Sequence, residues 1–142
     1  MDSLRVLVVD DEEDFLETLV NRLRRREIEA TGVRSGEAAL EEMKKKLFDV
    51  VILDIKMPGG MDGIEALREM KKVQPLAEVI LLTGHASVET SIEGMKLGAF
   101  DYLLKPVKLE ELLPKLLQAF EKKDKQDQKI RSAKIKEALK YW

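Results

Sequence analysis

Short apolar runs alternate with longer amphipathic segments over the first 120 residues of the chain. Five of these runs have the length and the β-branched or aliphatic content of strands. They lie at residues 4–9, 29–33, 50–54, 79–83 and 99–105. In the middle run, residues 50–53 are all aliphatic, a pattern typical of a central strand that is covered on both faces.

Each run is followed by a segment with apolar residues three and four positions apart, as expected for helices that cover a sheet. The first and last segments show this best, with Phe15, Leu16, Leu19, Val20 and Leu23 in one and Leu109, Leu112, Leu113, Leu116, Leu117 and Phe120 in the other. Five alternations of strand and helix require parallel strands joined by right-handed crossovers. The pattern therefore predicts a doubly wound α/β fold with helices on both faces of one parallel sheet.

Polar residues end four of the five predicted strands. They are Asp10 and Asp11 after the first, Asp54 in the third, Thr83 in the fourth and Lys105 in the fifth. Open α/β sheets place their ligand crevices at the carboxyl ends of the strands, so these side chains are expected to converge at one edge. Asp54 by itself, just before a turn with Pro58 and Gly59, would fit a turn former or a helix cap equally well.

Convergence of these side chains has a chemical consequence. Three carboxylates a few ångströms apart raise one another's pKa and cannot all stay ionised without a nearby cation. An all-oxygen site suits Mg²⁺, which takes one or two carboxylates and leaves positions for water and phosphate oxygens. Lys105 adds a fixed positive charge and Thr83 a hydroxyl donor. This set indicates a cradle for a phosphoryl group, with an aspartate as the nucleophile.

Composition limits the class of protein. A chain of 142 residues is long enough for one domain with a substantial core. It has no cysteine, which excludes disulfides and thiolate chemistry, and no secretory signal or apolar run of membrane-spanning length. We therefore expect a cytoplasmic protein. Residues 1–120 carry 17 Lys/Arg against 23 Asp/Glu, a balance that disfavours direct binding to nucleic acid.

Five motifs, taken together, resemble the response-regulator receiver domain of two-component signal transduction, the family of the chemotaxis regulator. They are Asp10-Asp11, Asp54 followed by Met57-Pro58, Met61-Asp62-Gly63, Thr83-Gly84, and Lys105-Pro106 with Tyr102 before it. The resemblance covers about residues 4–120, so we expect a receiver domain at 1–120. It implies a flavodoxin-like (βα)5 fold with a five-stranded parallel sheet in the order 2-1-3-4-5.

The resemblance also implies roles for the residues at the strand ends. Asp54 would be the phosphoacceptor. Asp10, Asp11, Asp54 and the backbone carbonyl of Lys56 would bind Mg²⁺, with Asp10 reaching the ion directly or through water. The phosphoryl group would come from a histidine kinase or a phosphotransfer protein. The domain would then be a phosphoacceptor with its own self-phosphorylation and autodephosphorylation chemistry, not an enzyme that turns over.

Three further residues would transmit the signal in this family. Lys105 would pair with the phosphoryl group, Thr83 would move to hydrogen-bond it, and Tyr102 would turn inward. The surface of the fourth helix, the fifth strand and the fifth helix would change as a result and control an output domain or partner, with a homodimer through that surface as one form of output. Tyr102 also fits a simpler role as a half-buried strand aromatic.

The loop after Asp54 departs from the family pattern, because Gly59-Gly60 contains one residue more than the usual single position between Pro58 and Met61. We expect this loop to be longer and looser than in relatives. Lys56 and His85, each two residues beyond a site residue, occupy positions that tune phosphoryl lifetime in the family. An exposed loop histidine is the simpler interpretation of His85.

The last 22 residues differ in character from the body. Residues 121–142 carry eight Lys/Arg and four Asp/Glu, and after a stretch without apolar side chains Ile135, Leu139 and Trp142 recur at helical spacing. We expect a basic, polar C-terminal extension or linker helix here. It would be either a frayed continuation of the last helix or a segment that pairs with a second copy or leads to an output domain.

Three other functions are compatible with parts of the pattern. A receiver-like docking module without phosphorylation is the main alternative. A flavin binder on the same fold would need a phosphate loop after the first strand, where the five acids 10–14 would repel a phosphate. An aspartyl phosphatase would need a second Asp two positions past its nucleophile, and Lys56 stands there.

Overall fold

The computed structural model describes residues 4–84 and 88–140 and shows one parallel sheet with the strand order β2-β1-β3-β4-β5. The strands are β1 (Arg5–Val9), β2 (Glu29–Val33), β3 (Val50–Asp54), β4 (Glu78–Thr83) and β5 (Asp101–Leu104). The helices are α1 (Glu13–Arg24), α2 (Gly36–Lys45), α3 (Gly63–Val73), α4 (Val88–Lys96) and α5 (Leu109–Leu139). Both the predicted doubly wound fold and the predicted strand order are confirmed. The predicted fifth strand is the least accurate, because β5 begins two residues later than expected.

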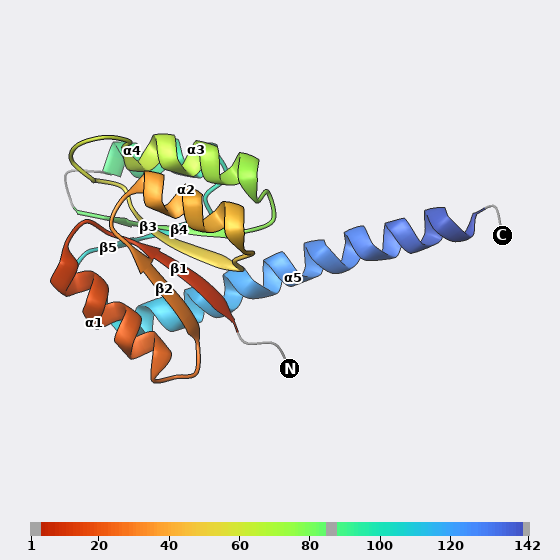
Figure 1. Cartoon of the computed structure of the whole chain (residues 1–142), viewed down its shortest axis with the longest axis horizontal. Helices are drawn as coiled ribbons and strands as arrows, with labels where there is room; N and C mark the ends of the chain where they lie inside the picture. Colours follow the sequence, from red (N-terminus) through yellow and green to blue (C-terminus); the bar gives the residue numbers. More distant parts are fainter. Residues whose placement is uncertain (1–3, 85–87, 141–142) are drawn as a thin grey trace.

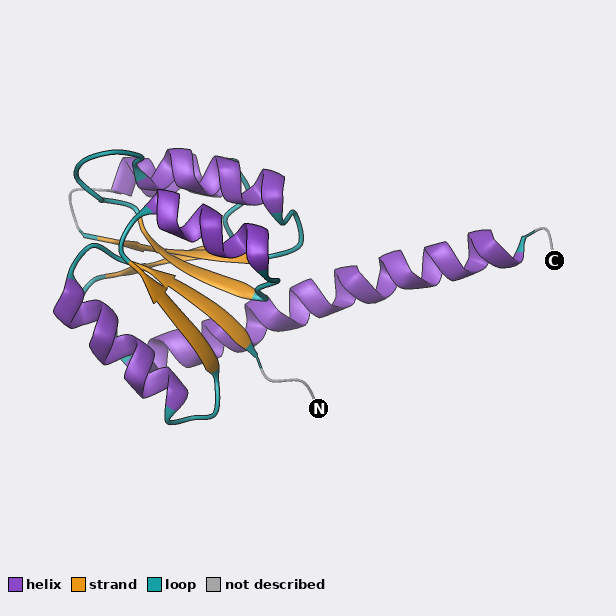
Figure 2. Cartoon of the chain, in the orientation of Figure 1, coloured by secondary structure: helices purple, strands orange, loops and turns teal. Residues whose placement is uncertain are grey.

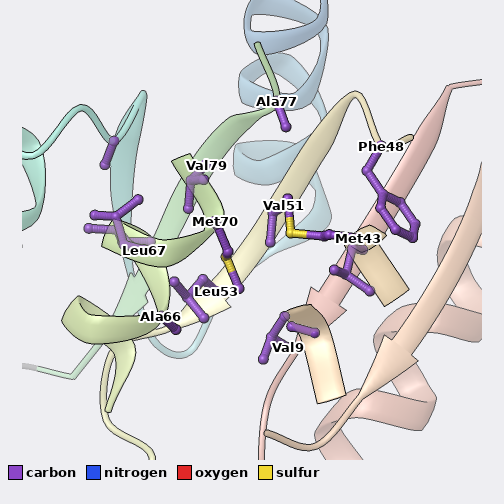
Figure 3. Packing of buried hydrophobic residues seen from close by; sticks show 14 of the residues in the cluster. Val9, Met43, Phe48, Val51, Leu53, Ala66, Leu67, Met70, Ala77 and Val79 are labelled. Carbon is purple, nitrogen blue, oxygen red and sulfur yellow. The ribbon is translucent and has the colours of Figure 1, made fainter. Parts of the chain in front are cut away.

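Helices cover both faces of the sheet, with α2, α3 and α4 on one side and α1 and α5 on the other (Figures 1 and 2). The core is correspondingly split into two clusters. Side chains alternate between the two faces along a strand, so β3 serves both. Val51 and Leu53 pack in the cluster under α2 and α3 (Figure 3), whereas Val50 and Ile52 pack in the cluster under α1 and α5. This double coverage is why the middle strand is aliphatic throughout.

Local capping explains where three helices begin or end. The Ser35 hydroxyl accepts a hydrogen bond from the Ala38 amide at 3.1 Å and caps α2, and the Asp62 carboxylate accepts one from Glu65 at 2.9 Å and caps α3. Gly98, just after α4, has φ of +103°, a left-handed conformation that favours glycine and ends the helix. The caps at Ser35 and Asp62 fix the loops that lead from strand ends into α2 and α3.

The fifth helix continues without interruption to Leu139 and projects away from the body of the domain (Figure 1). Two lysines near its middle bind acids at the amino-terminal edge of the sheet. Lys123 Nζ lies 2.9 Å from Asp49 Oδ1 and Lys122 Nζ lies 3.4 Å from Glu78 Oε1. The expected extension is thus one continuous helix with α5, and it contacts the body beyond residue 120. Within the described part of the chain, no helix is both long and apolar enough to cross a membrane.

Candidate functional site

The candidate site lies at the carboxyl edge of the sheet, where β1, β3, β4 and β5 end. Backbone pairing places Asp54 beside Leu82, one residue before Thr83, and the Lys105 amide donates a hydrogen bond to the Thr83 carbonyl at 2.8 Å. Asp10, Asp54 and Thr83 are buried, with exposed fractions of 0%, 4% and 0%. The parallel order of the strands therefore gathers the predicted residues into one partly enclosed site.

Three carboxylates form a cluster in this site. Asp10, Asp11 and Asp54 each offer an oxygen, and these oxygens all lie within 4.8 Å of one another. Two of the carboxylates are held by backbone amides, since Asp10 Oδ1 accepts from the Glu12 amide at 2.9 Å and Asp54 Oδ1 accepts from the Lys56 amide at 3.1 Å. An all-oxygen donor set of this spacing fits a hard divalent cation.

Lys105 neutralises part of the negative charge of the cluster. Its Nζ donates to Asp10 Oδ2 at 2.8 Å and to Asp54 Oδ2 at 3.3 Å, and it lies 3.7 Å from Glu12 Oε1. Burial by itself would lower the pKa of Lys105. The hydrogen bond with Asp10 and the negative charges of Asp54, Asp10 and Glu12 outweigh this effect and raise the pKa, so Lys105 is a firmly charged cation.

Asp54 is the acid most affected by these surroundings. Its pKa is raised from 3.8 to about 6, first by burial and then by the charge of Asp10, although Lys105 and the Lys56 amide act in the opposite direction. A cation bound beside it would favour the ionised form. Ionisation of Asp54 is therefore coupled to the presence of positive charge in the site.

Thr83 and Tyr102 lie in the two strands beyond β3. The Thr83 hydroxyl donates a hydrogen bond to the carbonyl of its neighbour Gly84 at 2.9 Å, so its present partner lies in its own loop. Tyr102 is 39% exposed and is paired in register with Leu81. The structure thus shows a satisfied hydroxyl at the site and a partly exposed aromatic on the neighbouring strand. The switching roles of both stay predictions.

The loop after Asp54 contains Lys56, whose side chain is exposed and whose amide binds Asp54. Gly59 and Gly60 have φ of +78° and +64°, conformations that favour glycine. The far end of the loop is not free: the Met61 amide donates to Glu37 Oε1 at 3.1 Å, which limits the looseness that the extra residue suggested. The other residue assigned to rate tuning, His85, lies outside the described residues.

A sequence model of the response regulator receiver domain matches residues 6–117 of the chain. The chain belongs to this family. The receiver domain is 39% identical over 111 residues to the transcriptional regulatory protein ZraR of Escherichia coli strain K12, an alignment that covers 78% of this chain and 25% of that protein. The chain therefore spans about a quarter of the length of the curated relatives it matches.

Solved structures agree with the receiver-domain family. The structure of a response regulator receiver domain protein from Clostridium thermocellum has a TM-score of 0.81 and 36% identity, covering 85% of this chain and 97% of that one. A structure described as adenylate cyclase from Rhodopirellula baltica has a TM-score of 0.88 and 30% identity, covering 94% of this chain and 98% of that one. The receiver fold is thus shown by sequence and by structure.

Three residues of this receiver domain contact the site or its loop and were not assigned there from the sequence. In the sequence, Glu12 is one of the five acids 10–14, Phe15 is one of the apolar positions of the first helix, and Glu37 carries no functional signal. Glu12 lies near Lys105, the Phe15 ring centroid is 4.6 Å from Lys105 Nζ, and Glu37 holds the loop after Asp54. A signal existed only for Glu12, since it precedes the first residue of α1 and belongs to an unusually dense run of acids.

Proposed function

We propose that this receiver domain is a switch that accepts a phosphoryl group on Asp54 from a histidine kinase or a phosphotransfer protein. One observation supports this most strongly. The ammonium of Lys105 lies between Asp10 and Asp54, 2.8 Å and 3.3 Å from their oxygens, beside a cluster of three carboxylates. Two kinds of positive charge, a fixed ammonium and a metal ion, can thus meet an incoming phosphoryl group at a buried nucleophile.

The two oxygens of Asp54 have different hydrogen-bond partners. Oδ1 accepts from the Lys56 amide and Oδ2 faces Lys105. In the transfer, an oxygen of Asp54 forms a bond to phosphorus while the bond from phosphorus to the donor breaks, and the donor leaves with that electron pair. Mg²⁺ held by Asp10, Asp11, Asp54 and the Lys56 carbonyl would neutralise charge on the phosphoryl oxygens. The domain is then a phosphoacceptor and not an enzyme that turns over.

The switch follows from a change of partner at Thr83. Its hydroxyl now donates to the Gly84 carbonyl, and a phosphoryl oxygen on Asp54 would be a stronger, charged acceptor. Because the phosphoryl oxygen is present only after phosphorylation, a hydrogen bond to it would favour one of two conformations of the domain. The population would then shift toward that conformation. The α4-β5-α5 surface would respond, with Tyr102 turning inward. This surface carries the exposed apolar side chains of Val88, Ile92, Met95, Tyr102, Leu104 and Leu117.

The length of the relatives supports a proposal about the output of the switch. ZraR is named a transcriptional regulatory protein, and the alignment covers only 25% of it. We propose that α5 leads the signal to an output domain or a partner protein and that the α4-β5-α5 surface forms a homodimer in the phosphorylated state. Light scattering with and without Mg²⁺ and beryllofluoride, a phosphoryl mimic, tests this, and an unchanged mass at high protein concentration would contradict the dimer.

Phosphorylation itself is tested by incubation with Mg²⁺ and acetyl phosphate followed by intact mass measurement. The wild type should gain the mass of one phosphoryl group. Asp54→Asn should gain none, and omission of Mg²⁺ should abolish the gain. Absence of an adduct in the folded wild type would contradict the proposal and favour a docking module that works without phosphorylation.

The lifetime of the phosphoryl group is expected to depend on Lys56 and His85. Substitution of either residue should alter the dephosphorylation rate and still allow phosphorylation, because neither supplies the nucleophile. Decay of the phosphorylated mass over time measures this rate. Identical decay in the wild type, Lys56→Ala and His85→Ala would show that these positions have no tuning role.

A further inference from the structure

An aromatic ring lies against the ammonium of Lys105, in addition to the carboxylates that face it. Phe15, the third residue of α1, places its ring centroid 4.6 Å from Lys105 Nζ. The face of an aromatic ring is electron-rich and attracts a cation at this distance. Among the described residues, the ammonium also forms ion pairs with Asp10, Asp54 and Glu12. Lys105 is thus held by three acids and by one neutral ring.

The ring is itself held in place by packing. Phe15 is partly buried and packs against the cluster of apolar side chains under α1 and α5. Its position at the start of α1, directly after the acidic residues that follow β1, brings it to the edge where β5 delivers Lys105. A rigid ring loses little freedom when it binds a cation.

A cavity beside Lys105 leaves room for its side chain to adopt other rotamers. Phe15 and Lys105 both line a cavity of about 490 Å³ between α1 and the loop after β5, together with Leu19, Val107 and Leu109. A long lysine side chain has several rotamers and is fixed only by its contacts. Without the ring, the ammonium would be held at the site by its contacts with the carboxylates.

The carboxylate contacts are also the ones that change during the proposed reaction. A metal ion held by Asp10 and Asp54 would compete with Lys105 for their oxygens, and phosphorylation would remove the free carboxylate of Asp54. The attraction of the ring neither titrates nor uses an N–H donor, so it persists through these changes and leaves the N–H groups free for phosphoryl oxygens.

We propose that Phe15 is a positioning residue whose ring keeps the ammonium of Lys105 over the phosphoacceptor, so that it speeds phosphoryl transfer from any donor. This role rests on the function proposed for the site. It differs from a packing role because it depends on the electrons of the ring and not only on its volume.

Substitutions that separate charge attraction from volume test the proposal. Phe15→Leu keeps an apolar side chain and removes the ring, and it should slow phosphorylation by acetyl phosphate by roughly 3- to 10-fold, the range expected for a partly buried cation–π contact. Phe15→Tyr and Phe15→Trp should stay within about twofold of the wild type, since they keep the attraction. Pentafluorophenylalanine at position 15, which keeps the shape and withdraws ring electrons, should behave like Leu. Thr18→Val, in the same cavity and exposed, is the matched control and should leave the rate unchanged.

A second readout does not depend on phosphorylation. In metal-free protein, the ring current of Phe15 should move the NMR signal of the Lys105 ε-methylene upfield, and Phe15→Leu should abolish this displacement while Phe15→Tyr keeps it. An undisplaced signal in the wild type, or equal rates for the Leu, Tyr and pentafluoro variants, would overturn the role of Phe15. A displaced signal in a wild type that takes no phosphoryl group would instead overturn the proposed function and leave the contact standing.

Discussion

At the scale of single residues, the ionisation of Asp54 is opposed by its own surroundings. Burial and the charge of Asp10 raise its pKa from 3.8 to about 6 despite the nearby Lys105. Because the folded state binds this proton more tightly than the unfolded state, the resulting stabilisation is complete below pH 3.8 and is lost as the pH rises through about 6. The loss amounts to about 3 kcal/mol, from about 1.4 kcal/mol per pKa unit.

Asp54→Asn should therefore remove this part of the pH dependence. Asparagine is neutral at every pH, so in the absence of divalent metal the variant should be more stable than the wild type above pH 7, by roughly 1–3 kcal/mol. Urea unfolding in EDTA between pH 4 and pH 8 measures both proteins. If the two stability curves run parallel, ionisation of Asp54 does not cost what its surroundings indicate.

Gly63 shows a second constraint at the residue scale, this time steric. A Cβ at this position would lie 2.5 Å from the Cα and the carbonyl oxygen of Ile55, which are backbone atoms that cannot rotate away. The start of α3 thus packs directly on the chain that leaves β3, and the Gly63 amide donates to the Ile55 carbonyl at 3.1 Å. This contact fixes the segment that carries Lys56.

Gly63→Ala should lower the free energy of unfolding by about 1–3 kcal/mol, the usual cost of overpacking. Gly84→Ala is the matched control, because a Cβ there meets no atom of the described residues within 4 Å. Chemical denaturation of both variants measures the difference. Equal stability of the two would mean that the backbone of α3 does not approach Ile55 closely.

At the scale of elements, α5 is joined to the amino-terminal edge of the sheet, opposite the candidate site. Asp49 accepts from the Arg5 amide and from Lys123 Nζ, each at 2.9 Å, and its side chain is 12% exposed. Glu78, with a side chain 5% exposed, pairs with Lys122 through Oε1. Two buried or half-buried acids thus set the direction in which α5 leaves the domain.

Removal of the Lys123 charge should destabilise the domain, because it leaves the buried Asp49 side chain with one partner fewer. We expect Lys123→Met, which keeps an apolar side chain of similar length, to cost about 1–3 kcal/mol. Lys125→Met, at an exposed position of the same helix, should stay within about 0.5 kcal/mol of the wild type. A double-mutant cycle with Asp49→Asn, read by urea unfolding, should show coupling between 49 and 123, and zero coupling would refute the contact.

At the scale of the whole molecule, the long helix divides into a part that belongs to the body and a part that does not. Residues through 127 include partly buried positions, whereas every described residue from 128 to 140 is exposed. Ile135 and Leu139, 59% and 58% exposed, contribute little to the stability of one copy.

Truncations at two points should separate these parts. A chain that ends at residue 129 should unfold within about 0.5 kcal/mol of the full chain, since the described residues that it loses, 130–140, are all exposed. A chain that ends at residue 120 loses Lys122 and Lys123 and should be less stable by about 1–3 kcal/mol. Thermal and urea unfolding compare the three proteins at equal concentration. If the two truncated chains are equally stable, the body ends at residue 120, as the charge pattern suggested.

The fold and the convergence of the main site residues could be predicted from the amino-acid sequence alone. Asp10 and Lys105 are 95 residues apart, yet their proximity was predictable, because parallel strands end at a common edge and the apolar runs showed where each strand stops. The pattern of apolar positions shows where the strands run and end. In β3, for example, every position is apolar up to Asp54 because the strand is covered on both faces.

Contacts between side chains that do not lie at strand ends could not be predicted and became visible in the folded structure. Phe15 over Lys105, Glu37 on the loop after Asp54 and Lys123 on Asp49 all join segments distant in the sequence. Each depends on the direction of a side chain and on where one helix lies against another element. The pattern of apolar positions specifies which face of a helix is buried, but it does not specify which polar group or ring meets a given charge at the boundary of that face.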